Sequence, residues 1–309
     1  MDLPKSIAEI ESALHQHRYV AEHGLATVIF LSLRLQKPLF LEGEAGVGKT
    51  EIAKVLADML QTRLIRLQCY EGLDVNAAVY EWNYSRQLLH IRLLEATGAH
   101  HDEALKEIFG PEFMIRRPLL QAIEETASRA PVLLIDEIDR ADEEFEAFLL
   151  ELLSDYQITI PEIGTLRAKE PPVVVITSNR TREVHDALKR RCLYHWIDYP
   201  TFQKEYRIVE TKRPEISTDL ARQVCTFVQA LRKEDLYKLP GVAETLDWAG
   251  ALATLGATSL DEDLVVDTLG TLLKYQDDIQ KIRAGNVGSL VELARADAGM
   301  DRASPERVG

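Results

Sequence analysis

The chain carries a glycine-rich run of eight residues, Gly43-Glu44-Ala45-Gly46-Val47-Gly48-Lys49-Thr50. It matches the pattern G-x-x-x-x-G-K-[ST], in which glycines let backbone N–H groups approach phosphate oxygens without a Cβ in the way. A short apolar run, residues 39–41, leads into it, and apolar residues at helical spacing follow over residues 51–60. This order predicts a strand, a phosphate-binding loop and a helix.

The loop predicts a nucleotide site for ATP and Mg²⁺. We expect Lys49 to lie on the β- and γ-phosphates and the hydroxyl of Thr50 to bind Mg²⁺. The predicted nucleotide-binding residues are 43–50 together with Glu51, the next residue of the helix.

A second apolar run ends in two acids and reads Leu133-Leu134-Ile135-Asp136-Glu137. Acids at the carboxyl end of a parallel strand lie where ligands bind in such sheets. We expect Asp136 to hold Mg²⁺ and Glu137 to act as the general base for an attacking water. Alone, residues 136–140 could equally be a charged turn that caps the next helix, and the upstream loop favours the catalytic interpretation.

Two further positions are candidate catalytic residues. Asn179 follows the apolar run 173–177, where its amide could hold the lytic water, although Asn at a strand end is commonly a turn former. Arg190 and Arg191 follow a helical segment. They could be solvated surface charge, or one could serve as an arginine finger for a neighbouring subunit's nucleotide.

The alternation of strand-like and helical segments predicts an α/β fold with a parallel sheet. Further strands are expected at 64–67, 132–135, 173–177 and 194–197. Residues 157–160 and 165–168 flank Pro161-Glu162-Ile163-Gly164, which predicts an inserted β-hairpin. An irregular insertion is expected between residues 71 and 118.

After Pro200 the strand signals stop and amphipathic helical patterns begin. We expect a nucleotide-binding α/β domain with N-terminal helices at 1–203, a helical lid domain at 204–282 and a loosely held tail at 283–309.

Composition narrows the function classes. The 309 residues are 46% hydrophobic and 28% charged, typical of a folded globular protein. A net charge of −14 disfavours sequence-independent nucleic-acid binding and favours protein partners. The three cysteines lack metal-ligand spacing, the histidines lack a metal-binding pattern, and no signal peptide or membrane segment is apparent, so we expect a soluble cytoplasmic protein.

The four motifs in this order resemble the AAA+ ATPases: Walker A at 43–50, Walker B at 133–137, sensor 1 at Asn179 and finger arginines near 190. The resemblance extends over residues 20–280 and implies a core strand order of 5-1-4-3-2. The hairpin before Asn179 is similar to that of the MoxR family. Residues 41–51 and 241–249 look most like its CoxD-type branch.

This resemblance implies a homo-oligomer, expected to be a hexamer, that remodels a protein client. It implies a von Willebrand factor A domain partner and a metalloenzyme client, with molybdenum hydroxylase maturation as the role of the CoxD-type branch. One departure is evident. Where many AAA+ lids carry a sensor 2 arginine, this chain has Ala243, Glu244 and Thr245.

Three alternatives stay open from the residues. A nucleic-acid-directed AAA+ motor is opposed by the acidic charge. A small-molecule P-loop kinase would need an acceptor pocket and a basic lid, and the basic pairs at residues 212–213 and 232–233 keep this alternative open. A nucleotide-dependent binding module without hydrolysis is disfavoured by the intact Glu137.

Overall fold

Five strands form one parallel sheet in the order β2-β5-β8-β1-β9. Their bounds are β1 Leu39–Gly43, β2 Leu64–Gln68, β5 Val132–Asp136, β8 Val173–Ser178 and β9 Leu193–Ile197. Strand β5 is buried throughout because both of its faces are covered, which suits a continuous run of β-branched and leucine residues. Read from β9, the sheet has the predicted 5-1-4-3-2 order. The predicted fold class is confirmed.

The computed structural model describes residues 3–97, 108–124, 129–285 and 287–300. By its internal contacts the chain separates into two units. The α/β unit contains residues 1–17, 21–42 and 50–196, and the helical unit contains residues 18–20, 43–49 and 197–309. The loop at 43–49 therefore groups with the helical unit, although it follows β1 directly.

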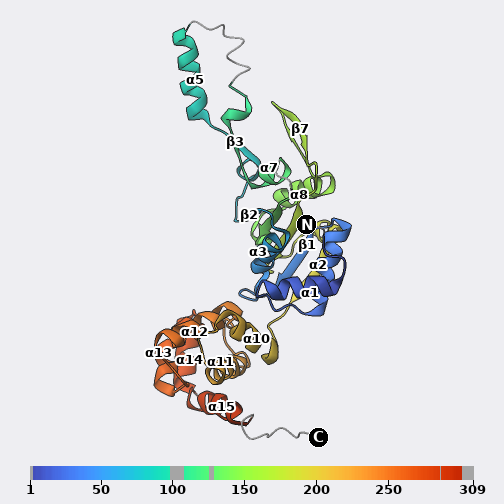
Figure 1. Ribbon diagram of the computed structural model, residues 1–309. Helices are drawn as coiled ribbons and strands as arrows, with labels where there is room; N and C mark the ends of the chain where they lie inside the picture. Colours follow the sequence, from blue (N-terminus) through green and yellow to red (C-terminus); the bar gives the residue numbers. More distant parts are fainter. Residues whose placement is uncertain (1–2, 98–107, 125–128, 286, 301–309) are drawn as a thin grey trace. The chain divides into compact units, whose positions relative to one another are not determined.

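Helices cover both faces of the sheet in the α/β unit (Figure 1). They are α1 Ile7–Gln16, α2 His23–Leu35, α3 Lys49–Leu60, α7 Pro118–Ile123, α8 Glu143–Asp155 and α9 Asp186–Arg191. Side chains from β5, β8, α7 and α8 form one apolar cluster that includes Leu133, Ile176, Leu120 and Phe145. This core holds the carboxyl ends of the strands in register.

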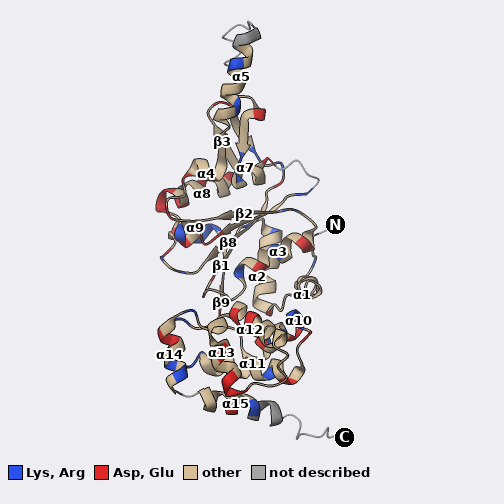
Figure 2. Cartoon of the chain, turned by 90° about the vertical axis from the view of Figure 1, so that its left-hand side faces the viewer, with Lys and Arg blue, Asp and Glu red and all other residues tan. Residues whose placement is uncertain are grey.

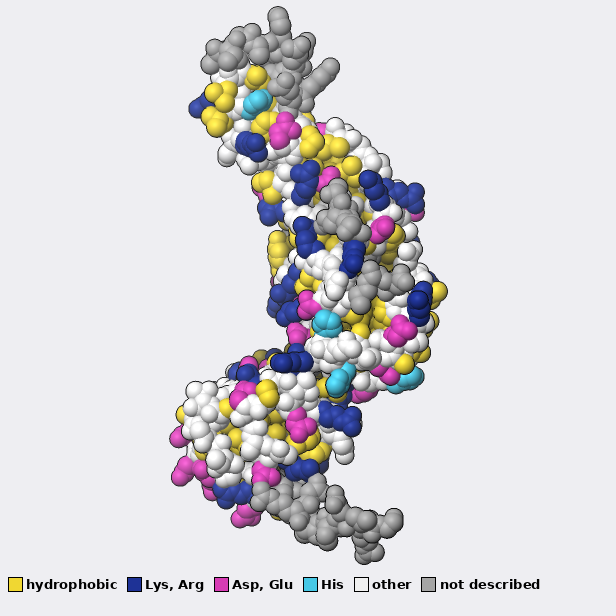
Figure 3. Space-filling model, in the orientation of Figure 1, with side chains coloured by type: hydrophobic (Ala, Val, Ile, Leu, Met, Phe, Trp, Pro, Cys, Tyr) yellow, Lys and Arg dark blue, Asp and Glu magenta, His cyan; other side chains and the backbone are white. Residues whose placement is uncertain are grey.

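The region predicted as an irregular insertion contains regular structure. Its elements are α4 Val75–Val79, β3 Tyr80–Trp82, α5 Tyr84–Thr97, the 3₁₀ turn η1 Pro111–Phe113 and β4 Met114–Arg116. Strands β3 and β4 pair antiparallel. Helix α5 leaves Tyr84, Leu88, Leu89 and Leu93 exposed, and hydrophobic side chains show on its surface in Figure 3.

The predicted hairpin is confirmed. It consists of β6 Gln157–Ile160 and β7 Gly164–Arg167, paired antiparallel. It lies outside the five-stranded sheet, as does the β3–β4 pair. Both antiparallel pairs are thus additions to the core.

The helical unit contains α10 Phe202–Lys212, α11 Thr218–Leu231, α12 Val242–Thr254, α13 Glu262–Leu272, α14 Gln276–Gly285 and α15 Val287–Met300. The expected loose tail from residue 283 is wrong for α15. Its Val287, Leu290, Val291 and Ala294 are buried in the core of this unit with α11. Their spacing of three and four residues is a short apolar stripe, which the small and charged residues around it obscure. Residues 301–309 lie outside the described part.

Candidate functional site

Glycine backbone conformations shape the loop after β1. Gly46 and Gly48 have φ of 79° and 95°, where residues with a Cβ are strained. A Cβ at Gly43 would lie 2.2 Å from the carbonyl oxygen of Ile197. The buried Lys49 donates from Nζ to the carbonyl oxygens of Gly43 at 2.8 Å and Glu44 at 2.6 Å. The loop is thus curled around its own lysine.

The loop also contacts the start of α12. The amide of Ala243 donates to the carbonyl oxygen of Gly46 at 3.1 Å, and a Cβ at Gly46 would lie 2.8 Å from the carboxylate of Glu244. Glu244 accepts from the amide of Gly241 at 2.9 Å and so caps the helix. Of the three residues in the stretch where a sensor 2 arginine is expected, Glu244 is therefore engaged in capping.

Asp136 joins three elements at the carboxyl ends of the strands. Its Oδ1 accepts hydrogen bonds from the hydroxyls of Thr50, at 3.0 Å, and of Thr177, at 2.5 Å, while Oδ2 accepts from Arg66. The residue is 2% exposed. The structure therefore brings together the two predicted metal ligands, Thr50 on α3 and Asp136 on β5.

Glu137 has a left-handed backbone, with φ of 55°, which is uncommon for a residue with a Cβ. Its amide donates to Thr177 Oγ1 at 3.0 Å, and its carboxylate lies 3.2 Å from Nη1 of Arg140. Arg140 ends the 3₁₀ turn η2 Ile138–Arg140 that follows β5. The carboxylate of Glu137 is thus paired with a cation of the turn that follows it, whereas that of Asp136 is bonded to residues of α3, β2 and β8.

Asn179 is held next to β5 through Asp139. The Asp139 carboxylate accepts from the amide of Asn179 at 3.1 Å, from the amide of Thr181 at 2.8 Å and from the Thr181 hydroxyl at 2.6 Å. Asp139 is 2% exposed, and these three donors satisfy its charge. Asn179, the predicted sensor 1 residue, and Glu137, the predicted base, thus follow the ends of the adjacent strands β8 and β5. The Asp139 carboxylate links these two strand ends.

Arg190 and Arg191 end the short helix α9, and both are exposed. Neither forms a side-chain hydrogen bond or an ion pair with another residue in the described part of the chain. The structure does not bring them to Asp136 or Glu137 within one subunit.

Four functional candidates escaped the sequence reasoning: Glu42, Arg66, Asp139 and Thr177. Glu42, immediately before the loop, is 3% exposed. It accepts from the Tyr194 hydroxyl at 2.8 Å and lies 3.5 Å from Lys189 Nζ and from Ser178 Oγ. For Glu42 and Thr177 the sequence does contain a usable signal, because each is a polar residue at the end of an apolar run.

Cys69 follows β2 and is buried near these acids. Burial raises the pKa of its thiol to about 12, and the negative charges of Asp136, Asp139 and Glu137 add to the effect. The thiol is therefore a neutral packing group and not a nucleophile at neutral pH.

A family model for the AAA domain of the dynein-related subfamily matches residues 38–192. The chain belongs to this AAA family. The matched span starts just before β1 and ends just after α9, so it contains the loop, both acids, Asn179 and the two arginines.

Relatives of this AAA chain include an uncharacterized protein of Staphylococcus epidermidis, 27% identical over 173 residues, which are 54% of this chain and 57% of that protein. Another is an uncharacterized protein of Staphylococcus aureus strain USA300, 27% identical over 172 residues, 53% of this chain and 57% of that protein. The matches thus span little more than half the length of these relatives.

Among solved structures, a point mutant of RuvB from Thermotoga maritima is similar, with a TM-score of 0.48 and 19% identity over 96% of this chain and 91% of that one. A second RuvB structure from that organism, titled a Holliday junction branch migration motor, has a TM-score of 0.45 and 18% identity, over 87% of this chain and 72% of that one.

In the described part of the AAA chain, no helix is long and apolar enough to cross a membrane.

Proposed function

We propose that the chain binds ATP with Mg²⁺ and hydrolyses it. The observation that carries this proposal is the hydrogen bond from Thr50 to Asp136, which joins the residue after the loop lysine to the end of β5. A hydroxyl and a carboxylate in contact are the protein ligands that P-loop enzymes offer to Mg²⁺. The glycine cradle before them suits phosphate oxygens.

Each residue has a separate task in this proposal. The ammonium of Lys49 would exchange its two carbonyl partners for phosphate oxygens, and Thr50 and Asp136 would hold Mg²⁺. When bound, the metal supplies positive charge to the phosphates. Glu137 would accept a proton from water, and the Asn179 amide would orient that water. Thr177 supports both acids because its hydroxyl bonds Asp136 and the amide of Glu137.

The arginine finger is proposed to come from another subunit. Within the described part of one subunit, Arg190 and Arg191 are exposed and unpaired at the end of α9, as expected for residues that complete a neighbour's site. This requires a homo-oligomer, and we propose a hexameric ring on the basis of the resemblance to AAA+ ATPases.

We further propose that ATP turnover drives chaperone-like remodelling of a protein client, as in the MoxR family. The hairpin before Asn179 and the sequence of residues 41–51 support this assignment. A von Willebrand factor A domain partner and a role in metalloenzyme maturation, specifically of molybdenum hydroxylases, follow from the CoxD-type resemblance alone. A cytoplasmic location would accord with this role.

The kinase alternative loses support from the helical unit. Arg232, one of the basic residues considered for a lid over phosphate, is 7% exposed at its side chain and bonds Glu205 through two nitrogens, at 2.7 and 2.6 Å. Its Nε bonds the carbonyl oxygen of Pro240 at 2.8 Å. This guanidinium is committed to internal packing.

The test separates binding from chemistry. Glu137→Gln should bind ATP as the wild type does and lose at least ~100-fold in turnover, since the amide cannot take a proton. Lys49→Ala should lose ATP binding measured by calorimetry. Glu151→Gln, an exposed position on α8, is the matched control. Normal turnover by Glu137→Gln would refute the assignment of the base, and normal ATP affinity in Lys49→Ala would refute the loop assignment.

A further inference from the structure

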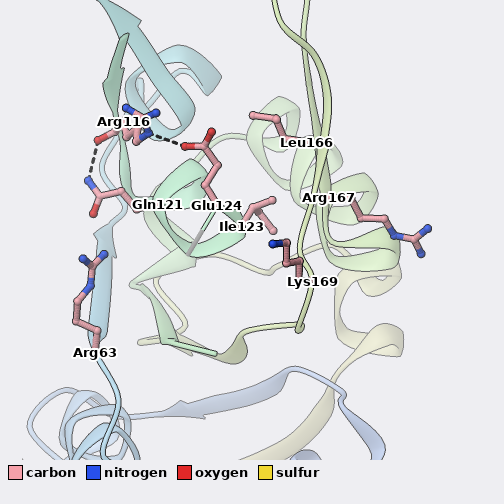
Figure 4. A pocket seen from close by; sticks show the side chains of 8 residues that line it. All are labelled: Arg63, Arg116, Gln121, Ile123, Glu124, Leu166, Arg167 and Lys169. Carbon is pink, nitrogen blue, oxygen red and sulfur yellow. Dashed lines mark hydrogen bonds and ion pairs between the residues drawn. The ribbon is translucent and has the colours of Figure 1, made fainter. Parts of the chain in front are cut away.

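A hollow in the α/β unit has a lining that shares no described residue with the proposed nucleotide site. It has a volume of about 710 Å³ and its lining includes Arg63, Arg116, Gln121, Ile123, Glu124, Leu166, Arg167 and Lys169. We call it the insertion groove, because β4 and the β6–β7 hairpin, which both lie outside the five-stranded sheet, supply part of its lining (Figure 4).

The insertion groove lies near the amino-terminal ends of β2 and β5, whereas Asp136 is at the carboxyl end of β5. Arg63 immediately precedes β2, and its carbonyl oxygen accepts from the amide of Val132, the first residue of β5. Asp136 is the last residue of the same strand. Four residue steps of about 3.3 Å separate the two ends by roughly 13 Å. A ligand in the groove would therefore not cover the region of Thr50 and Asp136.

Charge is the distinguishing property of the groove. Arg63, Arg116 and Lys169 face it, while the head of Arg167 points away from α7 (Figure 4). The acid among its described lining residues, Glu124, is bonded to Arg116 at 2.6 Å. Among the described lining residues the cations thus outnumber the acid, in a chain whose net charge is −14 and whose acidic side chains gather on α8 (Figure 2).

The groove also offers apolar contact. Leu166 on β7 is half-buried at the lining, and Ile123 on α7 forms the buried base beneath it (Figure 4). Cations beside the half-buried Leu166 suit a segment that is rich in carboxylates and carries some apolar side chains. No aromatic residue is among the described lining residues, whereas grooves for single-stranded nucleic acid combine positive charge with aromatic stacking.

We propose that the insertion groove binds an acidic segment of a protein client. Two of its walls come from additions to the core, so the segment could be gripped without occupying the nucleotide site. The proposal rests on the proposed function and deepens it by naming what the ATPase acts on. Binding of the segment itself requires no nucleotide.

The test measures binding of a fluorescein-labelled peptide of four Glu-Glu-Leu repeats by fluorescence anisotropy, without nucleotide. A peptide of Lys-Lys-Leu repeats and single-stranded oligothymidine are the comparison probes. The wild type should prefer the acidic peptide over both. Arg63→Glu/Lys169→Glu should raise its Kd at least about fivefold, since each reversal removes an attraction and adds a repulsion. Lys37→Glu/Lys233→Glu changes the net charge equally at exposed positions elsewhere and should leave the Kd near that of the wild type.

Lys169→Glu alone, an exposed change just after the hairpin, serves if the double variant unfolds, and should still weaken the peptide measurably. An unchanged Kd in Lys169→Glu and in a folded double variant would overturn the proposal. So would tighter binding of oligothymidine through the same residues. The ATPase assays on Glu137→Gln report independently on the proposed function, so either hypothesis can fail without the other.

Discussion

Arg66 donates two hydrogen bonds to a single oxygen of Asp136, from Nη2 at 2.6 Å and from Nε at 3.0 Å. A guanidinium thus lies against the carboxylate proposed to hold Mg²⁺. The Arg66 side chain is 51% exposed, whereas that of Asp136 is 3% exposed, so the arginine has room to move outward and the acid does not.

Because a positive charge opposes a second cation nearby, Arg66→Gln should lower the Mg²⁺ concentration needed for nucleotide binding, by roughly a factor of two to five. A magnesium titration monitored with a fluorescent ATP analogue measures this. Arg34→Gln, exposed on α2, is the control. A higher Mg²⁺ requirement would instead show that Arg66 orients the carboxylate.

Asp139→Asn should destabilise the α/β unit and impair turnover more than ATP binding. Three donors converge on this buried carboxylate, and hydrogen bonds to a charged acceptor are each worth about 1.5–3 kcal/mol. Urea unfolding and steady-state ATPase assays measure the two effects. Asp142→Asn is a matched control, because Asp142 caps α8 and asparagine caps equally well. Equal losses in both variants would remove the special role of Asp139.

Glu42 and Tyr194 should be energetically coupled. Tyr194→Phe removes a donor at 2.8 Å from a buried carboxylate, and Glu42→Gln removes its charge. In a double-mutant cycle, the combined loss of unfolding free energy should differ from the sum of the single losses by ~0.5–1.5 kcal/mol. Additive losses would mean that the hydroxyl has a separate partner.

Arg190→Ala/Arg191→Ala should bind ATP but hydrolyse it at least ~10³-fold more slowly, because the transferred phosphoryl charge would lack a guanidinium. Mixing this variant with Lys49→Ala protein should restore part of the turnover if the arginines act between subunits. Wild-type activity per subunit should also fall on dilution to monomers. Constant activity in a demonstrated monomer would rule out a shared site.

The cysteine thiols should react slowly with iodoacetamide at pH 8 and fully in urea. Burial raises the pKa of Cys69 and of Cys192 from 9.0 to about 12, with Arg191 opposing the shift at Cys192. A raised pKa stabilises the fold below pH 9, and that contribution is lost as the pH rises toward 12. Cys69→Ser should therefore make stability less dependent on pH above 9. Rapid alkylation of the native protein would contradict this burial.

The strand positions and the placement of Thr50 and Asp136 at one site were predictable from local patterns around apolar runs, whereas the strand order followed from the resemblance to the AAA+ ATPases. Arg66 and Asp139 were not, since their roles depend on which side chains meet across neighbouring strands. The helix α15 was missed for a different reason. Its few apolar residues are separated by small and charged ones, and only the packing against α11 shows that this short stripe is part of a core.

The capping of α12 illustrates the same limit. In the sequence, Glu244 is noticeable only because its stretch lacks the arginine expected there. In the structure it bonds the amide of Gly241, beside the loop residue Gly46. The structure therefore shows a capping role for Glu244 that its position in the sequence does not indicate.

The close approach of Gly43 to Ile197 limits which mutations this position can tolerate. Every single-nucleotide change that replaces a glycine codon with a codon for another residue adds a Cβ, and here that atom would lie 2.2 Å from a backbone oxygen that has no flexible side chain to move. No substitution at this codon is therefore expected to be only mildly destabilising. Position 43 should therefore not vary by neutral mutation. A saturation library selected for folded protein should recover only glycine at this position, whereas many residues should be tolerated at the exposed Glu44.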